Sequence, residues 1–459
     1  MAEVTTRKRT RLATLFQGNR PSARISKAIT MLGGAQVFNF AGSIIRIKLV
    51  ALWIGPIGIG LFSIFNNTLT TLLSILQSGY NQSAVRQIAA ARNKSDFNTL
   101  LLQASIGIAV LSTLLLLIFA RPLSSMVYGD TAMTPWFRLL GAAALFTAIL
   151  SGLLAILQAN GKITQFAKAQ TAGAVGGLAV SVPLFYFLRQ QSIVPSIVAY
   201  SFVSCIVAAC FVNRQIDFSP LKTLRDFFRD SSPIFRLGLY LTATVVATLL
   251  SNYAFMLWLN REAGTWEVGV WQAGYTITDR YVGILFSAIA LEYYPRISSM
   301  AAHPRGVLLA CRHEASFLLT LLLIAAPLLS LAAPWVIDIF YTSDFMEAHS
   351  YVAASATGLP LRAASFCLAF VILAHGNGTI YLITEITSAA LYFVISIFSF
   401  RLWGISGLGY GYAAWYTIYF IMVAFFVWRH FQVTLARRQW ILLISAMLLT
   451  ALPLLLRLA

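Results

Sequence analysis

The sequence predicts an all-α integral membrane protein, and three observations support this fold class. Hydrophobic residues make up 59% of the 459 residues, whereas charged residues make up only 10%. The mean hydropathy is +0.77, which excludes an ordinary soluble globular domain. The apolar stretches are long and continuous, while strands of membrane barrels need only about ten residues of alternating polarity. The membrane spans are therefore expected to be helices.

Thirteen apolar stretches lie between charged or turn-forming residues. Each of the first twelve suits a spanning helix, which needs about 20 residues. They cover residues 30–52, 57–77, 98–119, 133–158, 165–188, 193–213, 234–259, 268–294, 312–336, 350–374, 378–400 and 405–428. The thirteenth, 440–457, is shorter and contains Pro453, so a spanning helix and an interfacial helix both remain open for it.

The longest loop divides the twelve core stretches into two halves of six. This loop, residues 214–233, has mixed charge and is expected to be a cytosolic linker. The halves, 28–213 and 234–430, are expected to form two six-helix lobes. Outside them lie a basic cytosolic extension over 1–27 and an extra hydrophobic segment over 438–459.

A short internal repeat supports this division. Residues 59–62 read IGLF and residues 268–271 read VGVW, and each tetrapeptide follows a glycine-containing turn at the start of an even-numbered stretch. Two halves in the same orientation form a parallel repeat, in which the substrate site lies between the halves.

The basic residues predict the orientation. Most of the 33 lysines and arginines lie in the N-terminal tail or in loops on the same side, whereas the opposite loop 338–349 has three acidic residues and no lysine or arginine. Since cytoplasmic loops carry the basic excess, the N-terminus is expected in the cytoplasm. The same distribution explains most of the +18 net charge and predicts contact with anionic lipids, so nucleic acid is not an expected partner.

Motifs for catalysis and cofactor binding are missing from the sequence. It contains no Walker A motif and no long outside loop that could house a catalytic site. The four cysteines have neither a disulfide pattern nor metal-ligand spacing. A transporter without a metal or organic cofactor is expected rather than an enzyme.

Charges inside the stretch 268–294 indicate a cavity. A charge near the bilayer centre costs about 2.5–3.5 kcal/mol, so it is expected to face a partner or water. Asp279 lies near the middle of this stretch with Arg280 beside it, and Gln272, Tyr275 and Asp279 share a helical face by their spacing. This face is expected to line a cavity, with a buried ion pair to an arginine as the alternative.

Two further charges lie inside the later stretches. Arg362 is surrounded by small residues and offers a planar, permanent charge for phosphate or carboxylate, with a structural pair to Asp279 or Glu385 as the alternative. Glu385 is a candidate carrier of a coupling proton, or it is satisfied by neighbouring hydroxyl groups.

The first stretch contains Arg46 and Lys48. Arg46 is the deeper of the two and a cavity candidate, whereas Lys48 is expected to reach the membrane surface. Together these charges predict a hydrated, net-cationic cavity between the halves, which suits a polyanionic headgroup.

Three segments resemble a known family. KLVALWIGPIGIGLFSIF (48–65), EVGVWQAGYTITDRY (267–281) and YLITEITS (381–388) resemble the bacterial polysaccharide transporters of the multidrug/oligosaccharidyl-lipid/polysaccharide (MOP) exporter superfamily. Within this superfamily, the chain is similar to the lipid-linked oligosaccharide flippases for O-antigen and enterobacterial common antigen. The resemblance covers residues 28–430, and the basic extension, Arg280 and the extra C-terminal segment depart from it.

The resemblance implies a two-lobe exporter of twelve helices. Such proteins flip undecaprenyl-pyrophosphate-linked oligosaccharides across the bacterial inner membrane by alternating access, coupled to a proton or sodium gradient. By position, the resemblance implies functional roles for Lys48, Asp279, Arg362 and Glu385. Lys48 thus joins Arg46, Arg280, Arg362, Tyr275 and Gln272 as a substrate-binding candidate, while Asp279 and Glu385 are coupling candidates.

Two other functions are alternatives to a flippase. A polysaccharide polymerase or ligase on the same lipid carrier is expected to carry a large outside loop. A small-molecule antiporter for cations is expected to have an acidic cavity. The expected partners are the lipid-linked oligosaccharide, anionic lipids and other polysaccharide-assembly proteins.

Overall fold

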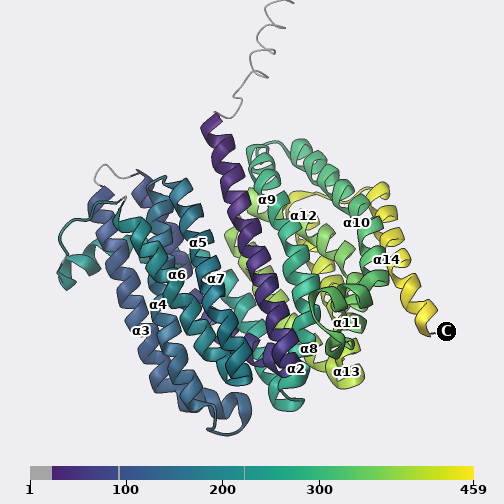
Figure 1. Ribbon diagram of the computed structural model, residues 1–459. Coiled ribbons are helices and arrows are strands. Elements are labelled where there is room, and N and C mark those ends of the chain that lie inside the picture. Colours follow the sequence, from purple (N-terminus) through teal and green to yellow (C-terminus); the bar gives the residue numbers. More distant parts are fainter. Residues whose placement is uncertain (1–22, 91–93, 215, 222, 459) are drawn as a thin grey trace, which may run out of the picture.

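The computed structural model describes residues 23–90, 94–214, 216–221 and 223–458, and every regular element in these ranges is helical (Figure 1). The elements are α2 (Ala23–Ala90), α3 (Lys94–Tyr128), α4 (Thr134–Ala159), α5 (Ile163–Leu188), η1 (Arg189–Ser192), α6 (Ile193–Asn213), α7 (Leu224–Glu262), α8 (Thr265–Tyr275), η2 (Thr276–Tyr281), α9 (Val282–Ser299), α10 (Pro304–Phe340), η3 (Ser343–Phe345), α11 (Ala348–Ala356), α12 (Leu359–Ala374), α13 (Gly378–Phe431) and α14 (Arg437–Leu458). The predicted all-α class is confirmed.

Several of these helices are long and apolar enough to cross a membrane. Within the described ranges there are seven, or eight if α11 and α12, which meet at a bend of 52°, form one span. The seven are Asn39–Gln77, Lys94–Tyr128, Thr134–Ala159, Ile163–Asn213, Ala243–Glu262, Pro304–Phe340 and Gly378–Phe431. The chain is therefore a multi-pass membrane protein.

Two helix boundaries differ from the sequence prediction. The linker predicted over 214–233 is shorter, because α7 already begins at Leu224. Similarly, α2 begins at Ala23, and the rest of the predicted basic extension lies outside the described residues. Charged residues interrupt an apolar stretch, but they are compatible with a helix that continues into water.

The two longest helices are kinked at glycines. In α2 the backbone leaves helical geometry at Gly55, where φ is 77° and ψ is −162°, and Pro56 follows. In α13 the break lies at Trp403 and Gly404, and φ of Gly404 is 60°. Glycine adopts positive φ without a steric penalty, and proline lacks the amide hydrogen that an α-helix needs. Each helix therefore consists of two arms.

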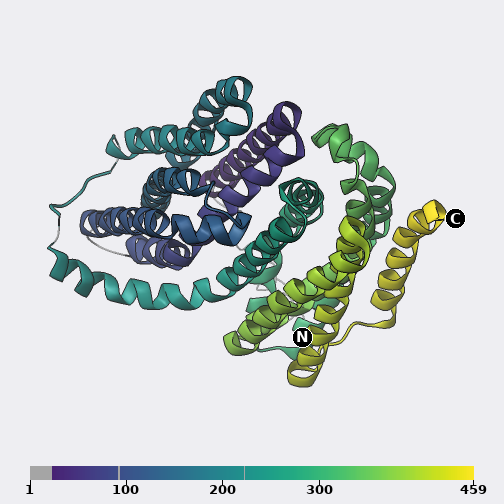
Figure 2. The same cartoon turned by 90° about the horizontal axis from the view of Figure 1, so that it is seen from below.

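The helices form two groups with α2 between them. Figure 1 shows α3 to α6 on one side and α10 to α14 on the other, and the view from below in Figure 2 shows the same separation. α2 packs against α4, α5, α7 and α8, so it contacts elements from both halves of the chain. One buried apolar cluster extends over both halves, while a second lies within α9 to α14 and a third within α2 to α6 and the residues that follow.

The contact between α2 and α8 is a close approach of two backbones. A Cβ atom on Gly269 would lie 2.0 Å from the carbonyl oxygen of Pro56 and 3.1 Å from the amide nitrogen of Gly60. A Cβ atom on Gly60 would lie 2.1 Å from the carbonyl oxygen of Thr265. Gly60 and Gly269 are the equivalent glycines of the IGLF and VGVW segments. The internal repeat is thus the place where the two halves touch backbone to backbone, and we call it the glycine crossing.

The glycine crossing generates the first prediction. Gly60→Ala and Gly269→Ala each require backbone atoms to move, and we expect each to destabilise the protein by about 1–3 kcal/mol or more. The measurement is thermal unfolding of the purified protein in detergent. Gly107→Ala in α3 is the matched control, since its Cβ would meet nothing within 4 Å and alanine is the better helix former. Equal melting temperatures for all three variants would contradict the crossing.

Candidate functional site

Three of the cavities formed by the described residues contain the charged residues of interest. The central cavity has a volume of about 1300 Å³ and is lined mainly by α2, η2 and α9. The N-half cavity, of about 330 Å³, lies among α2, α4 and α6. The C-half cavity, of about 410 Å³, lies among α7, α8, η2, α12 and α13. The charged residues of the candidate site, apart from Lys48, are distributed over these cavities.

The central cavity is cationic. Its polar lining residues are Asn39, Ser43, Arg46, Asn66, Tyr200, Thr276, Arg280, Tyr281 and Ser287. None of its described lining residues is acidic. A water-filled space with this lining favours an anionic ligand, because the arginine charges have no counter-charge in the wall.

Arg46 is held between two aromatic rings. The central carbon of its guanidinium lies 4.7 Å from the ring centre of Phe62 and 4.6 Å from that of Tyr200. Its Nε and Nη2 atoms have no hydrogen-bond partner among the described residues. Both atoms are enclosed by protein, so their hydrogen-bonding capacity is unsatisfied in this conformation. Arg46 lines both the central and the N-half cavity and therefore lies at their boundary.

Arg280 and Gln272 lie on the same side of their segment. Arg280 is exposed to the central cavity and donates to Oδ1 of Asn67 at 3.2 Å. Gln272 is buried beside it in a small recess that both residues line, and its Nε2 donates to Thr276 at 3.2 Å. Arg280 forms no ion pair with an acidic residue of the described ranges.

The predicted single face of this segment is divided between two cavities. Tyr275 and Asp279 line the C-half cavity, whereas Gln272, Thr276 and Arg280 face the central side. The reason is that residues 276–281 form a π-helix, whose turns are wider than α-helical turns, so that the residue spacing of an α-helix does not apply. The adjacent residues Asp279 and Arg280 thereby line different cavities.

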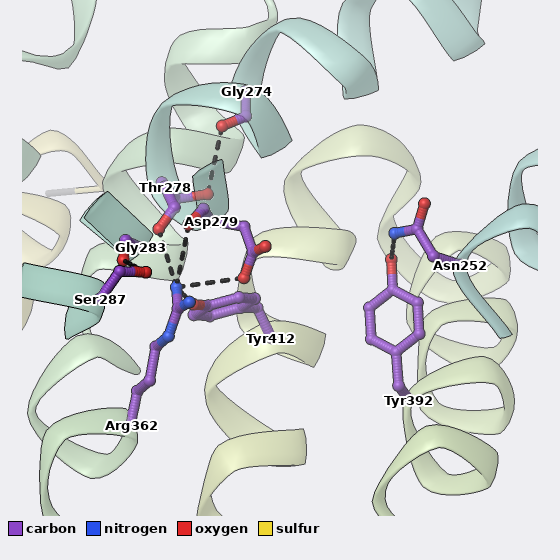
Figure 3. A network of polar contacts seen from close by, with 9 residues as sticks. All are labelled: Asn252, Gly274, Thr278, Asp279, Gly283, Ser287, Arg362, Tyr392 and Tyr412. Carbon is purple, nitrogen blue, oxygen red and sulfur yellow. Dashed lines mark hydrogen bonds and ion pairs between the residues drawn. The ribbon is translucent and has the colours of Figure 1, made fainter. Parts of the chain in front are cut away.

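Asp279 forms an ion pair with Arg362 of α12 (Figure 3). Nη1 of Arg362 lies 3.1 Å from Oδ1 of Asp279 and donates to the backbone carbonyl of Thr278 at 3.3 Å. The same nitrogen lies 3.1 Å from the hydroxyl of Tyr412, which rests against the end of the guanidinium in Figure 3. Phe286 packs over the guanidinium at 5.0 Å. The structural pair that the sequence left as an alternative for Arg362 is thus present.

Glu385 lies in the same C-half cavity, in an aromatic environment. Tyr419 donates its hydroxyl hydrogen to Oε1 of Glu385 at 2.6 Å. Around them the cavity is lined by Tyr275, Phe366, Phe370, Tyr381, Tyr392, Trp415 and Tyr416. The side-chain amide of Asn252 adds a polar group to the cavity lining and contacts the Tyr392 hydroxyl at 3.4 Å. The cavity therefore combines two carboxylates with aromatic faces and one arginine.

Lys48 lies outside the lining of these three cavities. Its ammonium group donates to the backbone carbonyls of Asp338, at 2.9 Å, and Tyr341. These carbonyls lie at the C-terminal end of α10, where a cation stabilises the helix dipole and the free carbonyl groups. Lys48, in the first half of the chain, thereby binds the end of a helix in the second half.

Several cavity residues were not identified from the sequence. Asn66 and Tyr200 line the central and N-half cavities, and neither carries a charge that would mark it in an apolar stretch. In α13 the residues Tyr412, Trp415, Tyr416 and Tyr419 follow helical spacing, and this pattern was a usable signal for an aromatic face.

Comparison with known families confirms the resemblance that the sequence suggested. Residues 25–301 match the family described as polysaccharide biosynthesis protein. A lipid III flippase of Escherichia coli (strain K12) is 22% identical over 424 residues, covering 87% of this chain and 99% of the relative. The lipid III flippase of Shigella flexneri matches to the same extent.

Solved structures show a shared fold. An inward-facing multidrug resistance MATE family transporter of the MOP superfamily superposes with a TM-score of 0.70 at 17% identity, covering 88% of this chain and 98% of that one. The lipid II flippase MurJ in an inward closed conformation superposes with a TM-score of 0.69 at 11% identity, covering 92% of this chain and 97% of that one. The chain therefore has the MATE/MurJ-like fold.

The ion pair in the C-half cavity generates a second prediction. Asp279→Asn and Arg362→Met each leave one charge without its partner, and we expect each to destabilise the protein by about 2–5 kcal/mol. The double variant should be less destabilised than the sum of the two, and thermal unfolding of all three measures the coupling.

An exposed ion pair provides the control. Arg401 and Glu262 lie 3.6 Å apart, with side chains 58% and 44% exposed, so that removing either partner should cost no more than about 1 kcal/mol. Additive effects of Asp279→Asn and Arg362→Met would show that the two groups do not depend on one another.

Proposed function

The chain belongs to the polysaccharide biosynthesis protein family, and from this premise we propose that it is a flippase for a lipid-linked oligosaccharide. Its substrate is an undecaprenyl-pyrophosphate-linked repeat unit of O-antigen or another surface polysaccharide. The protein moves this headgroup from the inner to the outer leaflet of the bacterial inner membrane by alternating access. The names of its lipid III and lipid II flippase relatives support this proposal.

In this proposal the chain has twelve core spans in two lobes. The first lobe consists of the two arms of α2 together with α3, α4, α5 and α6. The second consists of α7, the α8–η2–α9 segment, α10, the bent α11–α12 pair and the two arms of α13. α14 is then a thirteenth span that packs on α10.

The observation that carries the proposal is the cationic lining of the central cavity. Arg46 and Arg280 line a space of about 1300 Å³ between the two groups of helices, with no acidic residue in its described wall. A pyrophosphate carries several negative charges, and guanidinium groups bind phosphate oxygens through paired hydrogen bonds. The volume beyond the two arginines holds the glycan. Ile284 and Leu291 of α9 are exposed beside the cavity, and the prenyl chain runs in lipid along this helix.

The proposed orientation makes this conformation inward-facing. The central cavity is lined by both arms of α2, at residues 39–47 and at Phe62 and Asn66, whereas the glycine crossing lies closer to the Gly55 kink, where the two arms meet. With the N-terminus in the cytoplasm, the cavity opens inward and the crossing closes the outer side. Lys48 also lies on this outer side and joins α2 to α10. Export of the headgroup therefore requires the crossing to separate as the lobes rock.

The C-half cavity is the proposed coupling site. A proton or sodium ion that binds Asp279 competes with Arg362 for the same carboxylate, so it weakens the link between η2 and α12. Glu385 is the second cation-binding group of this cavity. Since η2 also carries Arg280, a change at Asp279 is transmitted to the headgroup site through one short segment.

A small-molecule antiporter is the second candidate function. The aromatic faces and the two carboxylates of the C-half cavity suit an organic cation. Transport of such a cation without any movement of a pyrophosphate lipid would favour this candidate.

The third prediction tests the central arginines. Arg46→Gln and Arg280→Gln each remove a charge-assisted hydrogen bond of about 1.5–3 kcal/mol, and we expect transport to fall by roughly 10- to 100-fold. The measurement is the appearance of headgroup in the opposite leaflet of liposomes that contain a pyrophosphate-linked prenyl oligosaccharide. Arg121→Gln, on the exposed side of α3, is the control and should transport normally. Normal transport by both cavity variants would refute the role of the central cavity.

The fourth prediction tests coupling. We expect Asp279→Asn and Glu385→Gln to remove the dependence of transport on an imposed ion gradient, because each lacks a negative charge that binds the cation. The measurement compares liposomes with a proton gradient, a sodium gradient and neither. Glu292→Gln is the control, since Glu292 is exposed and paired with Arg296 at 2.8 Å outside the cavities. Gradient dependence that persists in both cavity variants would place the coupling site elsewhere.

A further inference from the structure

The N-half cavity lies next to the proposed headgroup site. It shares three lining residues, Arg46, Asn66 and Tyr200, with the central cavity. The C-half cavity shares no described lining residue with the central cavity. A ligand bound at Arg46 is therefore adjacent to the N-half cavity, whereas the C-half cavity is a separate compartment.

The N-half cavity has a lining of mixed polarity, in which apolar groups supply most of the surface and none of the described residues is acidic. Apart from Arg46, its polar lining residues are Asn66, Thr70, Ser74, Gln77, Thr147, Ser151, Tyr200 and Ser201. Leu69, Leu73, Leu150 and Ile197 supply an apolar part of the wall. Hydroxyl and amide groups beside aliphatic groups match the two kinds of surface of a sugar ring, which carries hydroxyl groups at its edge and C–H groups on its faces.

Hydrogen bonds within the cavity wall determine which donors and acceptors remain free to bind a ligand. The hydroxyl of Thr70 donates to the carbonyl of Asn66 at 2.8 Å, and that of Thr147 donates to the hydroxyl oxygen of Ser201 at 2.9 Å. The amide nitrogen of Gln77 donates to the carbonyl of Ala148 at 2.8 Å. Because the hydroxyl hydrogens of Thr70 and Thr147 are already engaged, their oxygens act mainly as acceptors, and the Gln77 carbonyl oxygen is a further acceptor. The wall therefore favours a ligand that brings hydroxyl donors.

The position of Arg46 determines which part of the ligand lies in the N-half cavity. Its side chain lines both cavities beside the rings of Phe62 and Tyr200, and its enclosed Nε and Nη2 atoms have no partner among the described residues. An anionic group bound there is followed on the N-half side by space for an uncharged polar group. The N-half cavity measures about 330 Å³, at the lower end of the roughly 300–1,000 Å³ of small-molecule sites, so it holds a sugar unit rather than a whole oligosaccharide.

We propose that the N-half cavity is the binding site for the sugar that is linked directly to the pyrophosphate. This inference rests on the proposed function and assigns one part of the substrate to one part of the protein. Arg46 contacts the phosphate, the N-half cavity holds the first sugar, and the remaining sugars occupy the central cavity. The first sugar is thereby recognised by hydroxyl acceptors, whereas the rest of the glycan lies in a larger space.

The test compares binding of two kinds of lipid to the purified full-length chain. The probes are prenyl pyrophosphate without a sugar, and prenyl-pyrophosphoryl glucose, galactose and N-acetylglucosamine. We expect the wild type to bind at least one sugar-bearing probe about tenfold more tightly than the bare pyrophosphate. Thr147→Val with Ser201→Ala, which removes two hydroxyl groups at nearly constant volume, should bring this ratio close to one while the affinity for the bare probe stays unchanged.

Two further variants make the result specific. Ser201→Leu fills the cavity and should also abolish the preference, provided that the protein elutes as the folded wild type does. Thr417→Val in α13 is the matched control outside all three cavities, and it should keep the preference. Equal binding of all probes by the wild type, or a preference that survives the loss of both hydroxyls, would overturn the assignment. Failure of the wild type to bind even the bare pyrophosphate would overturn the proposed function itself.

Discussion

The arrangement of this protein depends on the contact of two backbones at the glycine crossing. No side chain separates α2 from α8 there, and the carbonyl oxygen of Pro56 occupies the space that a Cβ atom of Gly269 would need. Small residues allow such close approach in membranes, where lipid gives little hydrophobic drive for helices to associate. Because the crossing closes one end of the space between the two groups of helices, the central cavity is confined to the other end.

The charges of the membrane region are sorted by cavity. Arg46 and Arg280 face the central cavity, whose described wall has no carboxylate. Arg362 and Asp279 neutralise one another in the C-half cavity, where Tyr412 also contacts the guanidinium. An unpaired charge in a membrane is costly unless it faces water or a ligand. The two cavities therefore differ in kind, since one has free positive charge for an anion and the other has an internal ion pair that a small cation can disturb.

The sequence was sufficient for the class of fold, and it singled out most of the charged residues that line the cavities, because apolar length and intramembrane charge are local signals. The sequence did not reveal which groups these charged residues contact. The contact of Asp279 with Arg362, and that of Lys48 with the end of α10, join segments far apart in the chain. The helical spacing that placed Gln272 and Asp279 on one face assumed an α-helix, and the π-helix between them changes that geometry. Uncharged cavity residues such as Asn66 carry no signal in a single sequence.

The π-helix has a consequence for how such proteins diverge. A π-turn holds one residue more than an α-helical turn, so the loss of a single residue from 276–281 would restore α-helical turns while α9 kept its orientation relative to α8. The change would be confined to this segment, where Asp279 and Arg280 would take new positions relative to the two cavities. A one-residue gap at this place in an alignment therefore alters the charge that the cavities present, although nearly every amino acid is retained.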